Sequence, residues 1–225
     1  LSNACPERIE QENSKINAFI TVTSMLAIQQ ARQAEADLKR RKPAGLLRGI
    51  PIALKDLIHV AGVPTTAGTR FFGDSVAEED AHIFVKLRAA GAVLLGKLNL
   101  HEIALGVTNE NPHFGDCTNP HNPDHIAGGS SGGCAAALAV GMTFGAIGTD
   151  TGGSIRIPSG LCGVVGLKPT YGRGSTRGVI PLSWHLDHVG PMARTVHDTA
   201  LLFKAIAGYD PADPYAAQFP VEDVL

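Results

Sequence analysis

The chain has 225 residues, of which 44% are apolar and 18% are charged, and its formal net charge is −2. This is the composition of an ordinary globular protein that can bury a large core. A near-neutral charge is not that of a nucleic-acid binder, and no run of residues approaches the roughly 18 apolar residues of a membrane span.

The four cysteines, at positions 5, 117, 134 and 162, form no CxxC pair. Because no secretory signal is visible, we expect them to be reduced thiols of a cytoplasmic protein. The chain begins at Leu1 and ends in a proline-rich segment over 210–220. We interpret both ends as truncated and expect the sequence to be part of a longer polypeptide.

Predicted strands and helices alternate along the chain. Apolar runs predict strands over 17–22, 50–54, 92–95, 144–149 and 164–167. Helices are expected over 25–42 with Ser24 as N-cap, and over 80–90, 98–105, 134–140 and 195–207, with a loop over 109–124. The alternation favours the α/β class, with helices covering a mixed or parallel sheet.

Three polar motifs interrupt this pattern, and the first contains Lys55. Residues 50–56 read IPIALKD, so this lysine directly follows an apolar strand. Burial there would disfavour the ammonium form, lower its pKa and let Lys55 act as a base. The plainer alternative is a lysine at a strand end with its head group in water.

The second motif reads GGSSGG over residues 128–133. It fits the GxSxG pattern twice, around Ser130 and around Ser131, which suggests the nucleophile elbow of an α/β-hydrolase. That elbow needs a strand immediately before it, whereas residues 120–125 read PHNPDH and are typical of turns. A flexible linker is a further alternative, but a helix is expected to follow directly.

The third motif reads GTDTGGSIR over residues 148–156 and presents Ser154 after a predicted strand. Its glycines leave N–H groups open, and successive N–H groups can hold an anion such as the oxyanion of an acyl-transfer intermediate. A simple tight turn is the alternative. Fifteen of the 26 glycines lie between Gly128 and Gly178, which indicates backbone that turns sharply or approaches a ligand closely.

Two other kinds of site are less favoured. The loop over 109–124 and the adjacent His125 gather histidine, aspartate and cysteine, but the spacing matches no zinc pattern, so neither a metal nor a cofactor is predicted. Cys134 and Cys162 lie in apolar runs rich in small residues. We interpret them as packing residues and not as nucleophiles.

Together the three motifs resemble the amidase-signature family. Lys55 and Ser130 are 75 residues apart, and Ser130 and Ser154 are 24 apart, as in that family. Residues 162–170 (CGVVGLKPT) and 186–191 (LDHVGP) extend the similarity over about 17–210. Family members are considerably longer. The resemblance therefore implies that 1–225 is a fragment of one larger catalytic domain, with a sheet that is incomplete at its C-terminal side.

The resemblance implies a Ser-Ser-Lys triad. Ser154 would be the nucleophile, Ser130 the bridging serine behind a cis peptide bond, and Lys55 the terminal base. The remaining assignments are oxyanion-hole N–H groups at Thr151, Gly152, Gly153 and Ser154, and supporting side chains at Ser131, Asp150 and Arg156. A serine hydroxyl needs a base. Because none of the three motifs contains a histidine, a neutral Lys55 would accept the proton.

The family resemblance implies an amidase that cleaves carboxamide C–N bonds through an acyl-enzyme. One alternative is the glutaminase subunit of a tRNA-dependent amidotransferase, although residues 171–187 lean towards stand-alone bacterial amidases. Another is a non-catalytic, inactive fragment. The expected partner is a small-molecule amide, with no membrane contact and no direct nucleic-acid contact outside the amidotransferase case. The sequence leaves open whether the protein forms a homodimer.

Overall fold

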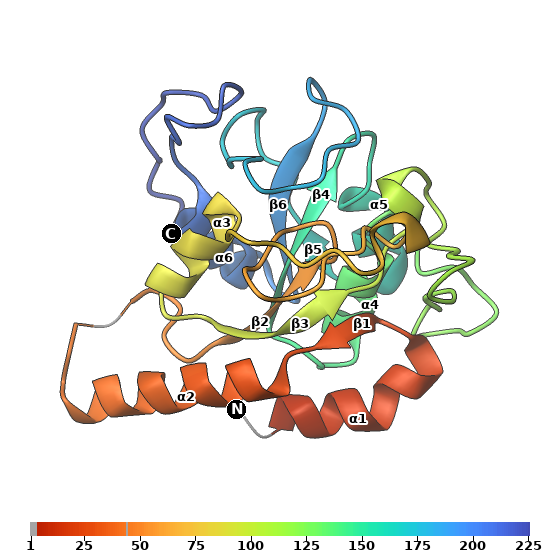
Figure 1. Ribbon diagram of the computed structural model, residues 1–225, viewed down its shortest axis with the longest axis horizontal. Coiled ribbons are helices and arrows are strands. Elements are labelled where there is room, and N and C mark those ends of the chain that lie inside the picture. The colour runs from red at the N-terminus through yellow and green to blue at the C-terminus, as the bar shows by residue number, and fades with distance from the viewer. Residues whose placement is uncertain (1–3, 44) are drawn as a thin grey trace.

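The computed structural model describes residues 4–43 and 45–225 (Figure 1). At its centre is a mixed sheet, whose six described strands follow the order β1-β3-β2-β4-β6-β5. The strands are β1 (Phe19–Val22), β2 (Pro51–Lys55), β3 (Val93–Leu98), β4 (Gly145–Asp150), β5 (Val165–Gly166) and β6 (His188–Ala193). β2 is parallel to β3 and β4, and the other neighbours are antiparallel. The predicted α/β class with a mixed sheet is confirmed.

Helices cover both faces of this sheet. They are α1 (Ala4–Ile16), α2 (Ser24–Lys39), α3 (His82–Ala89), α4 (Gly132–Ala139), α5 (Arg156–Cys162) and α6 (Val196–Ile206). α4 and α5 lie on one face and α3 and α6 on the other, while α2 extends along the lower edge in Figure 1. Over the described residues, no helix combines the length and apolar character needed to cross a membrane.

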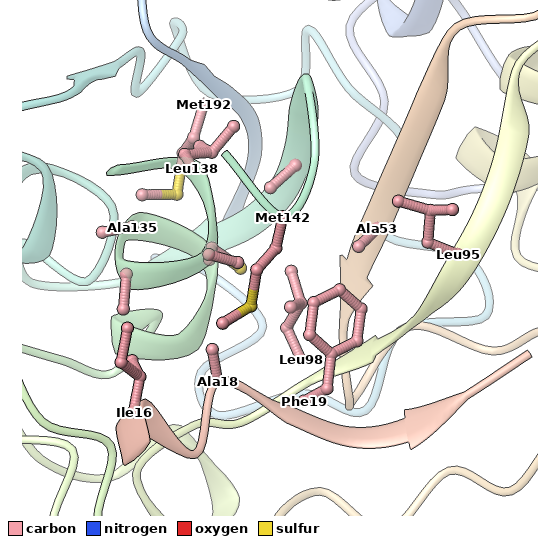
Figure 2. Packing of buried hydrophobic residues seen from close by; sticks show 14 of the residues in the cluster. Ile16, Ala18, Phe19, Ala53, Leu95, Leu98, Ala135, Leu138, Met142 and Met192 are labelled. Atoms are coloured by element: carbon pink, nitrogen blue, oxygen red, sulfur yellow. The ribbon is translucent and has the colours of Figure 1, made fainter. Parts of the chain in front are cut away.

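The two faces of β2 belong to two different parts of the core. Ile52 and Leu54 pack with side chains of α3 and α6, whereas Ala53 packs with α4. In Figure 2, Met142 lies between α4 and the ring of Phe19. Because side chains alternate along a strand, Lys55 continues on the Ala53 side and points towards the start of α4.

Two local predictions are wrong. Ser24 is the first residue of α2, and Thr23 occupies the N-cap position without a side-chain hydrogen bond to the helix. The helix expected over 98–105 is reduced to a single 3-10 turn, Glu102–Ala104. Within that turn Ile103 has a φ of 46°, in the left-handed region that side chains avoid.

Candidate active site

Lys55, the last residue of β2, ends in a buried polar space at the carboxyl edge of the sheet. β2 and β4 are parallel neighbours, so their carboxyl ends lie side by side. Lys55 Nζ donates hydrogen bonds to Ser130 Oγ at 2.7 Å and to Thr149 Oγ1 at 2.9 Å. The structure therefore brings together Lys55 and Ser130, two of the residues singled out in the sequence.

Burial changes the acid–base character of Lys55. The side chain is wholly buried, and the loss of hydration lowers the pKa of Lys55 from 10.5 to about 7. The negative charges of Asp187 and Asp150 act in the opposite direction without offsetting the effect of burial. An appreciable fraction of Lys55 is therefore neutral near neutral pH, with a lone pair that can accept a proton.

The glycine-rich run 128–133 lets the chain pass very close to its neighbours. The Gly129–Ser130 peptide bond is cis, as the family resemblance implies. A Cβ on Gly133 would lie only 2.5 Å from the carbonyl oxygen of Asn99, closer than real side chains come. The run is thus a packed segment that directs Ser130 towards Lys55, and the flexible-linker alternative is wrong.

Ser154 lies in the turn between β4 and α5, and 7% of its surface is exposed. The Ser131 N–H donates a hydrogen bond to the Ser154 carbonyl oxygen at 3.1 Å, which joins the two serine motifs. Within 4–43 and 45–225 no hydrogen bond links the hydroxyls of Ser130 and Ser154. Catalytic hydrogen bonds are often long before substrate binds, so the role of Ser154 stays a prediction.

Asp150 determines the shape of the Ser154 turn. Its carboxylate accepts hydrogen bonds from the N–H groups of Gly153 at 2.8 Å and Ile155 at 3.1 Å, and from the Arg156 guanidinium at 3.0 and 2.9 Å. Burial alone would raise the pKa of Asp150, but the bonds from Arg156 and the backbone outweigh it and lower that pKa. Asp150 therefore holds the turn as a carboxylate, with Arg156 as its counter-ion.

The turn leaves three N–H groups open near Ser154. In the described part of the chain, the N–H groups of Thr151, Gly152 and Ser154 have no hydrogen-bond partner. Gly153 is different because its N–H donates to Asp150. The expected oxyanion-hole role of Gly153 stays a prediction, and the other three N–H groups are the ones left open in this structure.

Sequence reasoning gave no role to two residues that adjoin the site. Thr149 bonds Lys55 through its side chain, and its carbonyl oxygen accepts from Ser131 Oγ at 3.1 Å. Its place one residue before Asp150, at the end of a strand parallel to β2, could have revealed it. Asp187 accepts a hydrogen bond from the Thr151 hydroxyl across β4 and β6. Only the motif LDHVGP pointed to that residue.

The less favoured sites are taken up by other contacts. His113 bonds Glu102 at 2.8 Å, and His121 bonds the carbonyl oxygen of Cys162 at 2.9 Å. The described residues contain no group of three or more His, Cys, Asp or Glu that could hold a metal ion. Cys134 and Cys162 are buried, and burial raises the pKa of each thiol to about 12. Their interpretation as packing residues is confirmed.

The chain is similar to known proteins over nearly its whole length. The amidase family model matches residues 1–224. The A subunit of glutamyl-tRNA(Gln) amidotransferase from Trichlorobacter lovleyi is 49% identical over 223 residues, which cover 99% of this chain and 46% of that protein. The chain thus spans about half the length of the curated relatives it matches.

Two solved structures are similar to almost the whole chain. The native peptide amidase of Stenotrophomonas maltophilia is 39% identical with a TM-score of 0.94, and the match covers all of this chain and 47% of the other. A vestigial protein complex that reveals the origins of an s-triazine catabolic enzyme contains a chain that is 43% identical, with a TM-score of 0.95 and coverage of 98% and 49%. Both matches cover nearly all of this chain and about half of the other protein.

Proposed function

This chain belongs to the amidase family, and on that premise we propose that the protein carrying it hydrolyses carboxamide C–N bonds through Lys55, Ser130 and Ser154. The observation that carries the proposal is the contact between the wholly buried Lys55 and the Ser130 hydroxyl. A lysine in that place is poised to accept a proton from Ser130, and Ser130 can in turn accept one from Ser154.

In the acylation step, Ser154 Oγ attacks the carbonyl carbon of the amide. Its proton passes to Ser130 Oγ, while the proton of Ser130 passes to the neutral amine of Lys55. The carbonyl oxygen gains negative charge, and the N–H groups of Thr151, Gly152 and Ser154 are the donors that would stabilise it.

The C–N bond then breaks. The leaving nitrogen takes back one proton through Ser130, which returns Lys55 to its neutral form and leaves Ser154 as an ester. Water attacks this ester with the same relay as its base, which releases a carboxylic acid and frees Ser154. Asp150 and Arg156 would keep the turn in shape throughout.

The test is to treat the intact protein with a fluorophosphonate and to locate the adduct by mass spectrometry. We expect the label on Ser154, and we expect its loss, together with amide hydrolysis, in Ser154→Ala. Ser159→Ala is the matched control, because this buried serine of α5 has no hydrogen-bond partner in the described part of the chain. A label on Ser130, or normal turnover by Ser154→Ala, would overturn the assignment.

The relatives named as amidotransferase subunits favour a second candidate, a glutaminase subunit that releases ammonia for a partner protein. The chemistry at Ser154 would be the same, and the difference lies in the substrate and the assembly. Purification of the intact protein from its host separates the two. Stoichiometric partner subunits with glutaminase activity would favour the amidotransferase, whereas a free protein that hydrolyses other carboxamides would favour the stand-alone amidase.

We also propose that residues 1–225 are part of one larger catalytic domain of a cytoplasmic protein with a small-molecule amide as substrate. The coverage of about half of each relative supports the first point. Light scattering on the intact protein would decide between a monomer and a homodimer.

A further inference from the structure

Asp187 stands next to the catalytic turn although it is far from it in sequence. It directly precedes β6, and the antiparallel register pairs His188 with Asp150, so Asp187 lies across from Thr151. One carboxylate oxygen, Oδ1, accepts a hydrogen bond from Thr151 Oγ1. Asp187 therefore touches the side chain of a residue whose N–H is a candidate for the oxyanion hole.

The other carboxylate oxygen of Asp187 belongs to a different segment. Oδ2 accepts hydrogen bonds from the N–H groups of Leu182 at 2.8 Å and Ser183 at 3.0 Å, so the carboxylate closes the loop 181–187 on itself. Asp187 and Trp184 of this loop line a small cavity together with Thr149, the second partner of Lys55. One carboxylate thus joins the loop, the catalytic turn and a cavity lined by Thr149, which bonds Lys55.

The catalytic turn has few side chains that could hold it from this side. Gly152 and Gly153, which follow Thr151, have no side chain. The hydrogen bonds of Asp150 hold the turn only from the N–H of Gly153 onward. The Thr151 hydroxyl is the anchor on the β6 side. A rotation of the Thr151 peptide would turn its N–H away from the carbonyl oxygen of the substrate.

We propose that Asp187 is a positioning residue of the amidase reaction: through the Thr151 hydroxyl it fixes the Thr151 N–H in the oxyanion hole and couples it to the loop 181–187. The proposal rests on the proposed function. It predicts that loss of the Thr151–Asp187 hydrogen bond lowers kcat more than it changes KM, because the oxyanion develops only in the transition state.

The charge of Asp187 provides a second, independent readout. The titratable groups that act on Lys55 are Asp187, Asp150 on β4 and Cys134 on α4; the two carboxylates hold the pKa of Lys55 up against burial, whereas the Cys134 thiol, with a pKa of about 12, is uncharged near neutral pH. Without the Asp187 carboxylate, the pKa of Lys55 falls further. The neutral, active form then persists to lower pH, so the acidic limb of the activity profile moves to lower pH.

The experiment uses the intact protein and compares Thr151→Val, Thr151→Ser, Asp187→Ala, Asp187→Asn and the double variant Thr151→Val/Asp187→Ala. We expect Thr151→Val and Asp187→Ala each to lower kcat by about tenfold or more with little change in KM, and the double variant to be no worse than the poorer single variant. Thr151→Ser, which keeps the hydroxyl, should recover most of kcat. Both Asp187 variants should move the acidic limb to lower pH, and Thr151→Val should not.

The matched control is Asp80→Asn. Asp80 is also half-buried and accepts a hydrogen bond from a loop N–H, that of Ala61 at 2.8 Å, but it lies beside α3 and contacts Arg88. The kcat and pH profile of Asp80→Asn should match those of the unmodified protein. Thermal unfolding identifies any variant that fails to fold. If Asp187→Ala fails to fold, the isosteric Thr151→Val still tests the proposal.

Normal kcat in Thr151→Val would overturn the proposal, and so would effects of Thr151→Val and Asp187→Ala that multiply in the double variant. An acidic limb that stays in place in both Asp187 variants would also count against it. These outcomes differ from a failure of the proposed function, which shows itself as fluorophosphonate labelling away from Ser154. If Ser154 is labelled and Thr151→Val is unaffected, only the role of Asp187 is lost.

Discussion

Two lysines among the described residues are fully buried, and their surroundings make them different. Lys97 lies 3.0 Å from the carboxylate of Asp56, whereas Lys55 faces two hydroxyls. Burial lowers the pKa of both, but at Lys97 the neighbouring Asp56 opposes this through both its charge and a hydrogen bond. A carboxylate stabilises an ammonium, and a hydroxyl does so far less. Of the two, Lys55 is thus the side chain suited to act as a base.

The pH dependence of hydrolysis follows from this difference. Because the pKa of Lys55 is lowered to about 7, the amine is protonated below that pH and cannot accept the Ser130 proton. We expect kcat/KM to rise with pH with a midpoint near 7, well below the 10.5 of a free lysine, and to level off roughly one to two pH units higher. Stopped assays of a simple aryl amide between pH 5 and 9 would measure the limb.

Substitution of Lys55 tests whether this residue causes the acidic limb of the pH profile. General acid–base catalysis contributes roughly 10²–10⁴-fold, so Lys55→Ala should reduce turnover by about that factor. The residual activity should no longer have the limb near neutral pH. A Lys55→Ala variant with near-normal rates, or a profile that rises only above pH 9 in the unmodified protein, would remove the lysine from the proposed mechanism.

At the scale of elements, segments with a clear apolar pattern could be predicted from the sequence, and segments interrupted by glycine or proline could not. β2, β4, α3 and α6 have apolar runs and follow the expected ranges closely. β6 was missed because it contains Gly190 and Pro191, which normally count against a strand. α5 was missed because Pro158 and Gly160 interrupt it, although a proline in the first turn costs no hydrogen bond. α1 was missed as well, because it is mostly polar and buries only Cys5, Ile9 and Ile16.

The same contrast applies to the candidate site. The motifs around Lys55, Ser130 and Ser154 could be recognised because glycines and polar residues interrupt apolar segments there. Thr149 and Asp187 were harder to assign, because a threonine in a strand and an aspartate before one are ordinary. Their roles depend on which strands are neighbours, and the register of β4 with β2 and β6 is a property of the folded sheet.

The close approach of α4 to the rest of the core gives a prediction at this scale. A Cβ on Gly133 would lie 2.5 Å from the carbonyl oxygen of Asn99, and backbone cannot give way as a flexible side chain can. We expect Gly133→Ala to destabilise the protein by about 1–3 kcal/mol through overpacking. Chemical denaturation of the intact protein, followed by far-UV circular dichroism, would measure the change.

Gly160 is the matched control, because it also lies in a helix but a Cβ there would meet nothing within 4 Å. Gly160→Ala should stabilise the protein by about 0.5–1 kcal/mol, since alanine loses less backbone entropy than glycine in a helix. Equal effects of the two substitutions would show that the space around the α4 glycines does not limit the structure.

At the scale of the whole molecule, the candidate active site lies at the middle strands of the described sheet, and the sheet has a weak border at one side. β2 and β4, which carry Lys55 and the Ser154 turn, have a strand on either side. β5 forms the border with two residues, Val165–Gly166, and its outer side has no strand partner in the described part of the chain. Leu161 of the neighbouring α5 is 47% exposed.

This border leads to the last prediction, which concerns residues 1–225 produced on their own. An unpaired sheet edge beside exposed apolar side chains favours association with other chains. The proposed relay from Ser154 to Lys55 also needs its members held to about 0.5 Å, and the glycine-rich segments at the site have few side chains of their own to lock them. We therefore expect the isolated segment to aggregate and to hydrolyse amides far more slowly than the intact protein. The comparison requires light scattering and kcat/KM for a simple aryl amide, with intact Ser154→Ala as the inactive baseline. A monomeric segment with the kcat/KM of the intact protein would show instead that this half holds its own catalytic geometry, and that the rest of the protein serves another purpose.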